Sequence, residues 1–192
     1  MIKFERINRL KLILSKARLF LFKGNFFKLG KKSTILGSFR IKGAKYISIG
    51  NKVFIHDGSW IEALAAQPCL FIGNGTYIGR MSHIISLKSI TIGDNVLIAD
   101  KVYISDNSHE YQDINIPIKM QPIKLIREVV IGDNSWIGEN VSIIGANIGK
   151  HSIVAANSVV TKDIPDYCIG AGVPAKIIKR YDFSKQKWVK YP

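Results

Sequence analysis

The amino-acid sequence predicts an all-β solenoid, a coil of short parallel strands stacked along one axis. Three observations carry this prediction: an Ile or Val recurs every six residues, a small or branched residue stands two positions before it, and a glycine follows the first member of each triplet. Five such triplets recur along the chain, and such a repeat indicates a solenoid. Their members are Ile49, Ile55, Ile61, Ile72, Ile78, Ile84, Ile92, Ile98, Ile104, Ile131, Ile137, Ile143, Ile148, Val154 and Val160.

Each hexapeptide reads as one short strand and one turn. Residues two apart in a strand point to the same side, so each strand supplies two inward side chains. Three strands then make one triangular coil, and the sequence predicts about five to six coils. Gly, Asn or Asp at the corners supplies the positive φ that tight turns need, as in Gly73-Asn74-Gly75. A β-sandwich with evenly spaced strands is the alternative, but it gives no reason for the six-residue phase to persist.

The repeat resembles the hexapeptide-repeat acyltransferases over roughly residues 35–180. Residues 170–176, Gly-Ala-Gly-Val-Pro-Ala-Lys, match that family's closing motif almost letter for letter. The subgroup most similar acetylates sugars and polysaccharides and includes galactoside, maltose and colanic-acid acetyltransferases. The resemblance implies a left-handed parallel β-helix, although connections between parallel strands are otherwise nearly always right-handed. It also implies a homotrimer with sites between neighbouring solenoids.

The repeat breaks most widely between Ile104 and Ile131, which predicts a long loop over residues 105–128. Solenoids place such insertions on the binding face. The loop contains His109, and the resemblance implies that this histidine is the catalytic base. Asp106, or a backbone carbonyl, is expected to hold its second ring nitrogen. A plain loop histidine is the alternative.

Three further side chains occupy equivalent outward positions in successive coils: Trp60, His83 and Tyr103. They predict an aromatic wall beside His109 on which the apolar face of a sugar ring could stack. Outward aromatic residues can equally cover a subunit interface. The sequence leaves both interpretations open, and they are compatible if the acceptor binds between subunits.

The C-terminal coils resemble the family's coenzyme A site. The resemblance implies a groove that admits the pantetheine arm past small side chains and that offers lysines to its phosphates. The corner over residues 143–148 is one residue shorter than in many relatives. The residues expected to bind the cofactor are Trp136, Gly138, Ala156, Thr161, Lys162, Lys176 and Lys179.

Neither a metal site nor a nucleic-acid site is expected. Three protein ligands are needed for catalytic zinc, and the four histidines do not have the His-x4-His spacing of the gamma-class carbonic anhydrases that share this solenoid. The two cysteines, Cys69 and Cys168, are too few for a disulfide framework. The net charge of +14 suggests an anionic partner, but basic residues are not interleaved with aromatics as in a nucleic-acid module.

Residues 1–32 hold ten basic residues and one acid, with apolar residues such as Leu10, Leu14 and Leu21 at helical spacing. This pattern predicts an amphipathic helix that caps the first coil, that contacts an anionic membrane, or that does both. Neither a signal peptide nor a transmembrane helix is expected, which favours a cytoplasmic protein, with the inner membrane face as a peripheral option. The expected organisation is a helical segment over 1–32, the β-helix over 33–165 and a closing segment over 166–192.

These features together predict an acetyl-CoA-dependent O-acetyltransferase that modifies a sugar hydroxyl in surface polysaccharide biosynthesis. No Ser or Cys stands in a nucleophile elbow, so direct attack by the alcohol is preferred to a covalent acyl-enzyme. Acetyl-CoA is the expected acyl donor and a sugar or glycan the acceptor. Alternatives are N-acetyl or other acyl transfer to an amino sugar, and a non-catalytic solenoid scaffold.

Overall fold

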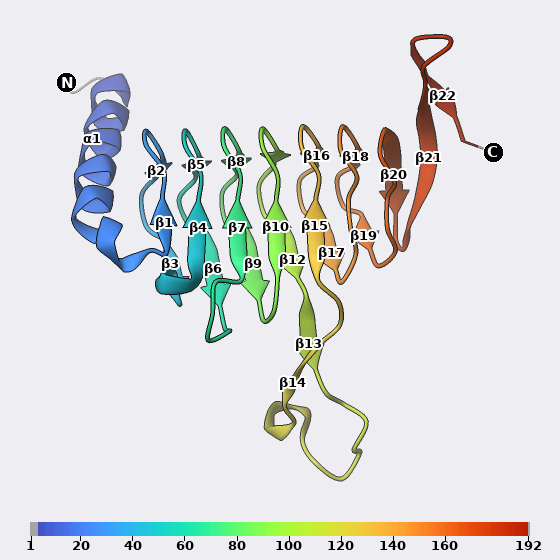
Figure 1. The fold of residues 1–192 in the computed structure, drawn as a ribbon, viewed down its shortest axis with the longest axis horizontal. Helices are drawn as coiled ribbons and strands as arrows, with labels where there is room; N and C mark the ends of the chain where they lie inside the picture. Colours follow the sequence, from blue (N-terminus) through green and yellow to red (C-terminus); the bar gives the residue numbers. More distant parts are fainter. Residues whose placement is uncertain (1–3, 192) are drawn as a thin grey trace.

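A helix, α1 (Phe4–Phe22), leads into a parallel β-helix with three faces in the computed structural model, which describes residues 4–191 (Figure 1). The first face is formed by β1 (Lys28–Leu29), β4 (Ile47–Ile49), β7 (Leu70–Ile72), β10 (Ile90–Ile92) and β15 (Val129–Ile131). The second is formed by β2 (Thr34–Ile35), β5 (Phe54–Ile55), β8 (Tyr77–Ile78), β11 (Leu97–Ile98), β16 (Trp136–Ile137), β18 (Ile153–Val154) and β20 (Cys168–Gly172). The third is formed by β3 (Arg40–Lys42), β6 (Trp60–Ala63), β9 (His83–Ser86), β12 (Tyr103–Ser105), β17 (Ser142–Ile144) and β19 (Val159–Val160).

The predicted parallel β-helix is confirmed, but the predicted coil number is too low. Single bridges at Ile148 and Ile164 continue the first face beyond β15, so the described residues form about seven turns. The first coil was missed although Leu29, Ile35 and Ile41 follow the same six-residue spacing. It lies partly inside the segment that was assigned to the helix. At the other end, β20 adds to the second face and continues as antiparallel strands β21 (Ala175–Asp182) and β22 (Lys187–Lys190).

The interior is a column of branched apolar side chains. All fifteen predicted positions are buried, and equivalent residues of successive coils are register partners, such as Ile78, Ile98 and Ile137 on the second face. Each strand is only two to four residues long through these coils, so its stability depends on this burial and on the neighbouring coils rather than on its own length.

The corner between the first and second faces is held by a ladder of side-chain amides and carboxylates. The backbone N–H of Asn51 donates to Asn74 Oδ1 (2.9 Å), that of Asn74 to Asp94 Oδ1 (2.6 Å), and that of Asp94 to Asp133 Oδ1 (2.7 Å). Positive φ occurs two residues after the glycine, at Gly75 and Asn95. Gly73 itself is needed for another reason: a Cβ there would lie 2.4 Å from the Gly93 carbonyl carbon of the next coil.

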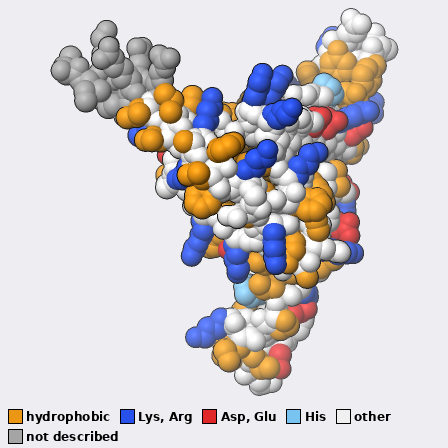
Figure 2. Space-filling view, turned by 60° about the vertical axis from the view of Figure 1, so that its left-hand side comes forward, with side chains coloured by type: hydrophobic (Ala, Val, Ile, Leu, Met, Phe, Trp, Pro, Cys, Tyr) orange, Lys and Arg blue, Asp and Glu red, His pale blue; other side chains and the backbone are white. Residues whose placement is uncertain are grey.

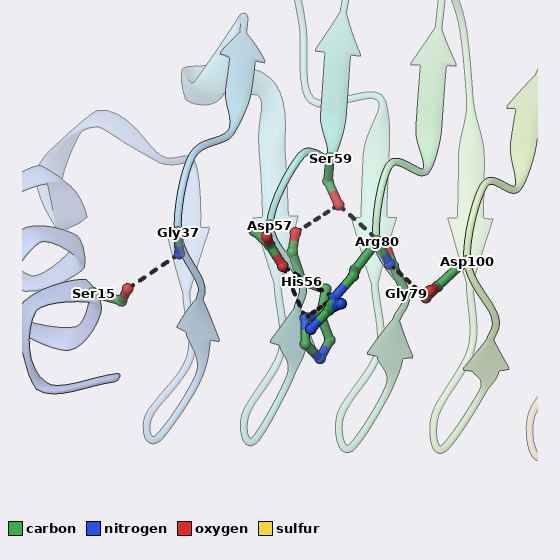
Figure 3. A network of polar contacts seen from close by, with 8 residues as sticks. All are labelled: Ser15, Gly37, His56, Asp57, Ser59, Gly79, Arg80 and Asp100. Carbon is green, nitrogen blue, oxygen red and sulfur yellow. Dashed lines mark hydrogen bonds and ion pairs between the residues drawn. The ribbon is translucent and has the colours of Figure 1, made fainter. Parts of the chain in front are cut away.

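Helix α1 covers the open end of the first coil, as the capping interpretation predicts. Ser15 and Leu19 are buried against the coil, and Ser15 Oγ accepts a hydrogen bond from the Gly37 N–H (3.3 Å; Figure 3). The Arg18 guanidinium donates to the Gly37 carbonyl and lies 4.3 Å from the centre of the Phe39 ring. Lys3 lies outside the described residues. No helix within residues 4–191 has the length and apolar character needed to cross a membrane.

The long insertion is not a plain loop. It leaves the third face after β12 and forms a two-stranded antiparallel hairpin of β13 (Asn107–His109) and β14 (Ile123–Leu125), with a short 3-10 turn at Ile118–Met120. The hairpin projects sideways from the middle of the solenoid (Figure 1). It therefore presents residues 107–125 away from the coils.

Two neighbouring residues of β11 test which side chains of a strand point into the interior column and which point to solvent. Ile98 is 0% exposed, whereas Leu97 is 45% exposed. We expect Ile98→Ala to lower the free energy of unfolding by about 3 kcal/mol, because it leaves a cavity in the column. The matched variant Leu97→Ala should cost less than about 1 kcal/mol. Urea unfolding measures both, and equal losses would contradict the assignment.

Candidate active site

His109 stands at the end of β13 with an exposed side chain, and its register partner on β14 is Ile123. Next to it, the Glu110 N–H donates to the Pro122 carbonyl (2.8 Å), and Lys124 Nζ pairs with Glu110 Oε2 at 2.9 Å. Within the described residues the imidazole forms no hydrogen bond. The backbone of His109 is thus fixed by a hairpin while its ring remains available to a substrate.

The root of the hairpin is fixed by Asp106, which is fully buried. Its carboxylate accepts hydrogen bonds from the backbone N–H groups of Leu87 (2.7 Å), Lys88 (2.8 Å) and Ser89 (2.9 Å) in the preceding coil. Its backbone carbonyl accepts the N–H of Ile126 (2.8 Å), on the returning strand. Asp106 therefore ties the outgoing and returning strands to the coil before them.

This geometry corrects the expectation that Asp106 orients the His109 ring. Asn107 Nδ2 (2.7 Å) is a fourth donor to the carboxylate, Ser86 Oγ lies 3.3 Å from it, and no hydrogen bond joins it to His109 in the described chain. A buried carboxylate that accepts four hydrogen bonds has little capacity left for an imidazole. Asp106 is a structural residue, and it acts on His109 only through the backbone.

Sequence reasoning missed two further polar residues at the same root, Ser105 and Asn107, of which Asn107 is a partner of Asp106. Ser105 Oγ donates to the Asn107 carbonyl (2.8 Å) and accepts the Asn107 N–H (3.1 Å), while Asn107 Nδ2 also donates to the Ile85 carbonyl (3.2 Å). The signal was the polar run Ser105-Asp106-Asn107 at the point where an apolar repeat stops. Polar side chains at a break in a solenoid must replace the lost backbone pairing.

Trp60, His83 and Tyr103 form one aromatic column on the third face. The rings of Trp60 and His83 stack at 4.3 Å with 10° between their planes, and Tyr103 follows at 5.3 Å and 56°. The Arg40 guanidinium lies 4.8 Å from the Trp60 ring centre. Burial lowers the pKa of His83, and the negative charge of Glu62 opposes this shift.

The aromatic column and His109 do not meet within one chain. The column stands at the first residues of β6, β9 and β12, whereas His109 follows Tyr103 by six residues, beyond the other end of the third face. Trp60 Nε1 and His83 Nε2 are buried and have no hydrogen-bond partner among the described residues. Buried polar atoms are usually hydrogen-bonded, so these two unpaired ring nitrogens are features that a purely structural aromatic stack does not require.

The seven residues expected at the cofactor are spread over the last coils. Gly138 packs directly on Ala156, since a Cβ at Gly138 would lie 2.6 Å from the Ala156 nitrogen. Trp136 is exposed on β16, and Thr161 and Lys162 are exposed after β19. Lys176 and Lys179 are exposed on β21. Ala156 also lines a pocket of about 390 Å³ with Lys101, Glu139, Asn140 and Asn157.

A second polar cluster lies at the corner between the second and third faces (Figure 3). Asp57 Oδ1 lies 3.2 Å from His56 Nδ1 and 3.3 Å from Arg80 Nε. The hydrogen bond from His56 is the largest cause that lowers the pKa of Asp57. Within the described residues, no group of three or more His, Cys, Asp or Glu side chains could hold a metal ion.

Comparison with known proteins places this geometry in a family. A family model described as the hexapeptide repeat of succinyl-transferase matches residues 128–162. A solved hexapeptide-repeat-containing acetyltransferase from Vibrio cholerae is 31% identical with a TM-score of 0.60, and the match covers 88% of this chain and 81% of that one. This chain belongs to the hexapeptide-repeat acetyltransferase family.

Curated relatives of this family member agree with the assignment. WbbJ of Escherichia coli K12, which carries the name of a lipopolysaccharide biosynthesis O-acetyl transferase, is 41% identical over 129 residues, covering 63% of this chain and 65% of WbbJ. Galactoside O-acetyltransferase of the same organism is 35% identical, covering 65% of this chain and 62% of that protein. The chain thus spans less than two thirds of the length of these relatives. The Vibrio cholerae protein has also been solved with acetyl coenzyme A, in a structure of TM-score 0.64 and 30% identity that covers 87% of this chain and 78% of that one.

The role of Asp106 in this family member can be measured through stability. Asp106→Ala leaves three partly buried backbone N–H groups, those of Leu87, Lys88 and Ser89, without an acceptor, and we expect the free energy of unfolding to fall by about 3 kcal/mol. Asp113→Ala, on the exposed part of the hairpin, is the matched control and should change it by less than about 1 kcal/mol. Urea unfolding of both variants is the test. An unchanged midpoint for Asp106→Ala would contradict the role of Asp106 in holding the root of the hairpin.

The lowered pKa of His83 predicts a pH dependence of stability. In the unfolded state His83 binds a proton with the ordinary pKa of 6.5, whereas the folded state binds that proton more weakly. The free energy of unfolding should therefore fall as the pH drops below 6.5. Unfolding free energies at about pH 7.5 and about pH 5.5 measure this loss. His83→Phe keeps an aromatic ring in the column and should show a smaller loss. The same loss in both proteins would show that His83 is not its source.

Proposed function

We propose that this protein is an acetyl-CoA-dependent O-acetyltransferase whose acceptor is a sugar hydroxyl, with His109 as general base. The observation that carries the proposal is His109 itself: an exposed imidazole without a hydrogen-bond partner among the described residues, on a hairpin whose root is held by Asp106. Family membership supports acyl transfer, and two relatives named as O-acetyl transferases, of lipopolysaccharide biosynthesis and of galactosides, support a sugar acceptor in surface polysaccharide biosynthesis.

The proposed step balances with one base. The neutral imidazole of His109 accepts the hydroxyl proton as the sugar oxygen attacks the thioester carbonyl of acetyl-CoA. The tetrahedral intermediate then collapses, the carbon–sulfur bond breaks, and the imidazolium returns the proton to the leaving thiolate. Acetyl-CoA would lie along the last coils, where Trp136, Gly138, Ala156, Thr161, Lys162, Lys176 and Lys179 are the proposed cofactor residues.

A homotrimer would bring the separated parts together. The projecting hairpin carries exposed apolar side chains, of which Ile114 is 93% and Met120 is 70% exposed. Such a patch is costly in water and is typical of a protein interface. If a neighbouring copy covers it, His109 of one copy can face the aromatic column or the cofactor residues of another. Trp60, His83 and Tyr103 are then proposed to stack on the acceptor sugar.

We also propose contact with the inner, cytoplasmic face of an anionic membrane through α1. Successive residues of a helix are rotated by about 100°, so Leu10, Ile13, Leu14 and Leu21 lie on the side opposite to the docked residues Ser15 and Leu19. All four are at least half exposed. This outward stripe (Leu10, Ile13, Leu14, Leu21), with Lys11 and Lys16 at its flanks, fits a helix that lies in a lipid interface. Capping and membrane contact use different sides of α1.

Substitution of His109 tests the chemistry. We expect His109→Gln to lower acetyl transfer by about 10²- to 10⁴-fold, the usual contribution of a general base, and to leave acetyl-CoA binding unchanged. Thiol release with a panel of sugars and amino sugars measures transfer, and calorimetric titration with acetyl-CoA and with CoA measures binding. His151→Gln, at an exposed corner, is the control.

These measurements separate the proposed function from its alternatives. Full activity of His109→Gln would contradict the assigned base. Transfer only to amino sugars would replace O-acetylation by N-acetylation. An absence of saturable acetyl-CoA binding would favour a non-catalytic scaffold.

A further inference from the structure

Basic charge is concentrated at the N-terminal end of the solenoid. Residues 1–56 contain fourteen of the 28 Lys and Arg residues and a single acid, Glu5, whereas the rest of the chain has fourteen bases and thirteen acids. Figure 2 shows Lys and Arg side chains over the end of the molecule next to α1. Through the end of the second coil at Ala63, which adds the acids Asp57 and Glu62, α1 and the first two coils carry +11 of the net charge of +14.

A pocket lies within this basic end, between the second half of α1 and the first corner of the solenoid. Its volume is about 370 Å³, and four lysines line it: Lys16 and Lys23 from the helix side, and Lys31 and Lys32 from the corner. No acid is among its described lining residues. By contrast, the pocket on the other flank of α1 includes Asp57, whose carboxylate offsets part of the positive charge there.

The corner also offers backbone donors, because it belongs to the first coil. In the second coil the Lys52 N–H donates back to the Lys31 carbonyl (2.9 Å), and the Val53 N–H donates back to Ser33 Oγ (3.1 Å). The equivalent groups of the first coil are the N–H of Lys32 and of Ser33, and no coil precedes them within residues 4–191. Neither forms a hydrogen bond within the described chain. Lys32 has a φ of 61°, the left-handed conformation that recurs in anion-binding backbone nests.

The pocket adjoins the apolar side of α1. Phe20 lines the pocket and is 77% exposed, and the outward stripe continues from it along the helix. Ammonium groups and free backbone N–H groups bind phosphate, while exposed Leu, Ile and Phe side chains enter the acyl region. The C-terminal end of α1 carries about half a negative charge, which four lysines outweigh.

We propose that this pocket (Lys16, Lys23, Lys31, Lys32 and the Lys32 and Ser33 N–H groups) binds the phosphate of an anionic phospholipid headgroup. The inference rests on the membrane contact proposed above and gives it a defined site. It differs from diffuse attraction of a basic surface, since four particular lysines share one headgroup. The binding fixes the end of the solenoid, and not its side, against the lipid surface.

Vesicle co-sedimentation of the full chain tests the pocket. The probes are phosphatidylcholine vesicles with and without phosphatidylglycerol. Lys23→Gln with Lys32→Gln removes two pocket charges, and Lys42→Gln with Lys52→Gln removes two charges of the first two coils outside it. We expect the pocket pair to weaken binding to the anionic vesicles by about tenfold or more, and the control pair by only a few fold. Amide NMR of Lys32 and Ser33, titrated with inorganic phosphate, reports occupation directly.

Three outcomes would overturn the proposal. Equal weakening by the two pairs would show diffuse charge attraction. Phosphate-induced shifts at Lys32 without vesicle binding would show a site for free phosphate and not for lipid. An absence of both would remove the site. Acetyl transfer to a soluble sugar is measured in parallel: both pairs should keep it, so loss of the pocket and loss of the enzymatic proposal are separate results.

Discussion

Every coil of this protein depends on its neighbouring coils for its backbone hydrogen bonds. A strand of two or three residues cannot persist alone, and here the backbone N–H groups that point along the axis donate to oxygens of a neighbouring coil, except at the first corner, where those of Lys32 and Ser33 have no acceptor in the described chain. This requirement fixes the distance between coils and leaves no space for a side chain at Gly73 and its equivalents. It also explains why Asn or Asp recurs at the same corner, where one side-chain oxygen replaces a missing carbonyl.

Because coils supply each other's hydrogen bonds, other groups must pair the backbone where the solenoid is interrupted by the hairpin and where it ends. At the hairpin, the chain leaves the stack, and Asp106 supplies acceptors to three backbone N–H groups that would otherwise lack them. At the N-terminal end, α1 covers the column, but the donors of the first corner have no preceding coil. At the C-terminal end, the antiparallel strands β21 and β22 continue the second face instead of another coil. Asp106 and the strands β21 and β22 thus replace pairing that the repeat cannot provide, whereas the Lys32 and Ser33 N–H groups of the first corner stay unpaired in the described chain.

These facts explain how far the sequence could be interpreted. The six-residue spacing predicted all fifteen buried positions, because each hexapeptide is one strand and one turn, both local features, and alternate strand residues point inward. The role of Asp106 could not be predicted this way, because its partners Leu87 to Ser89 lie seventeen to nineteen residues earlier in the chain. The first coil was overlooked because Leu29 and Ile35 follow a helix and stand near basic residues. The stacking of Trp60, His83 and Tyr103 could be predicted from their equivalent positions in successive coils. Their separation from His109 could not be predicted, because it depends on where the hairpin leaves the coil.

The polarity of the solenoid links the two proposals. Parallel coils are about 4.8 Å apart, and His109 leaves from the fourth coil, so it stands about 15 Å along the axis from the first. With the basic end held at a lipid surface, that height is fixed by the number of coils and does not depend on a flexible linker. A sugar joined to a membrane lipid would then present its hydroxyl within a narrow range of heights above the bilayer. If the proposals hold, the basic charge of residues 1–56 orients the remaining, nearly neutral part of the solenoid, which carries His109, toward its acceptor.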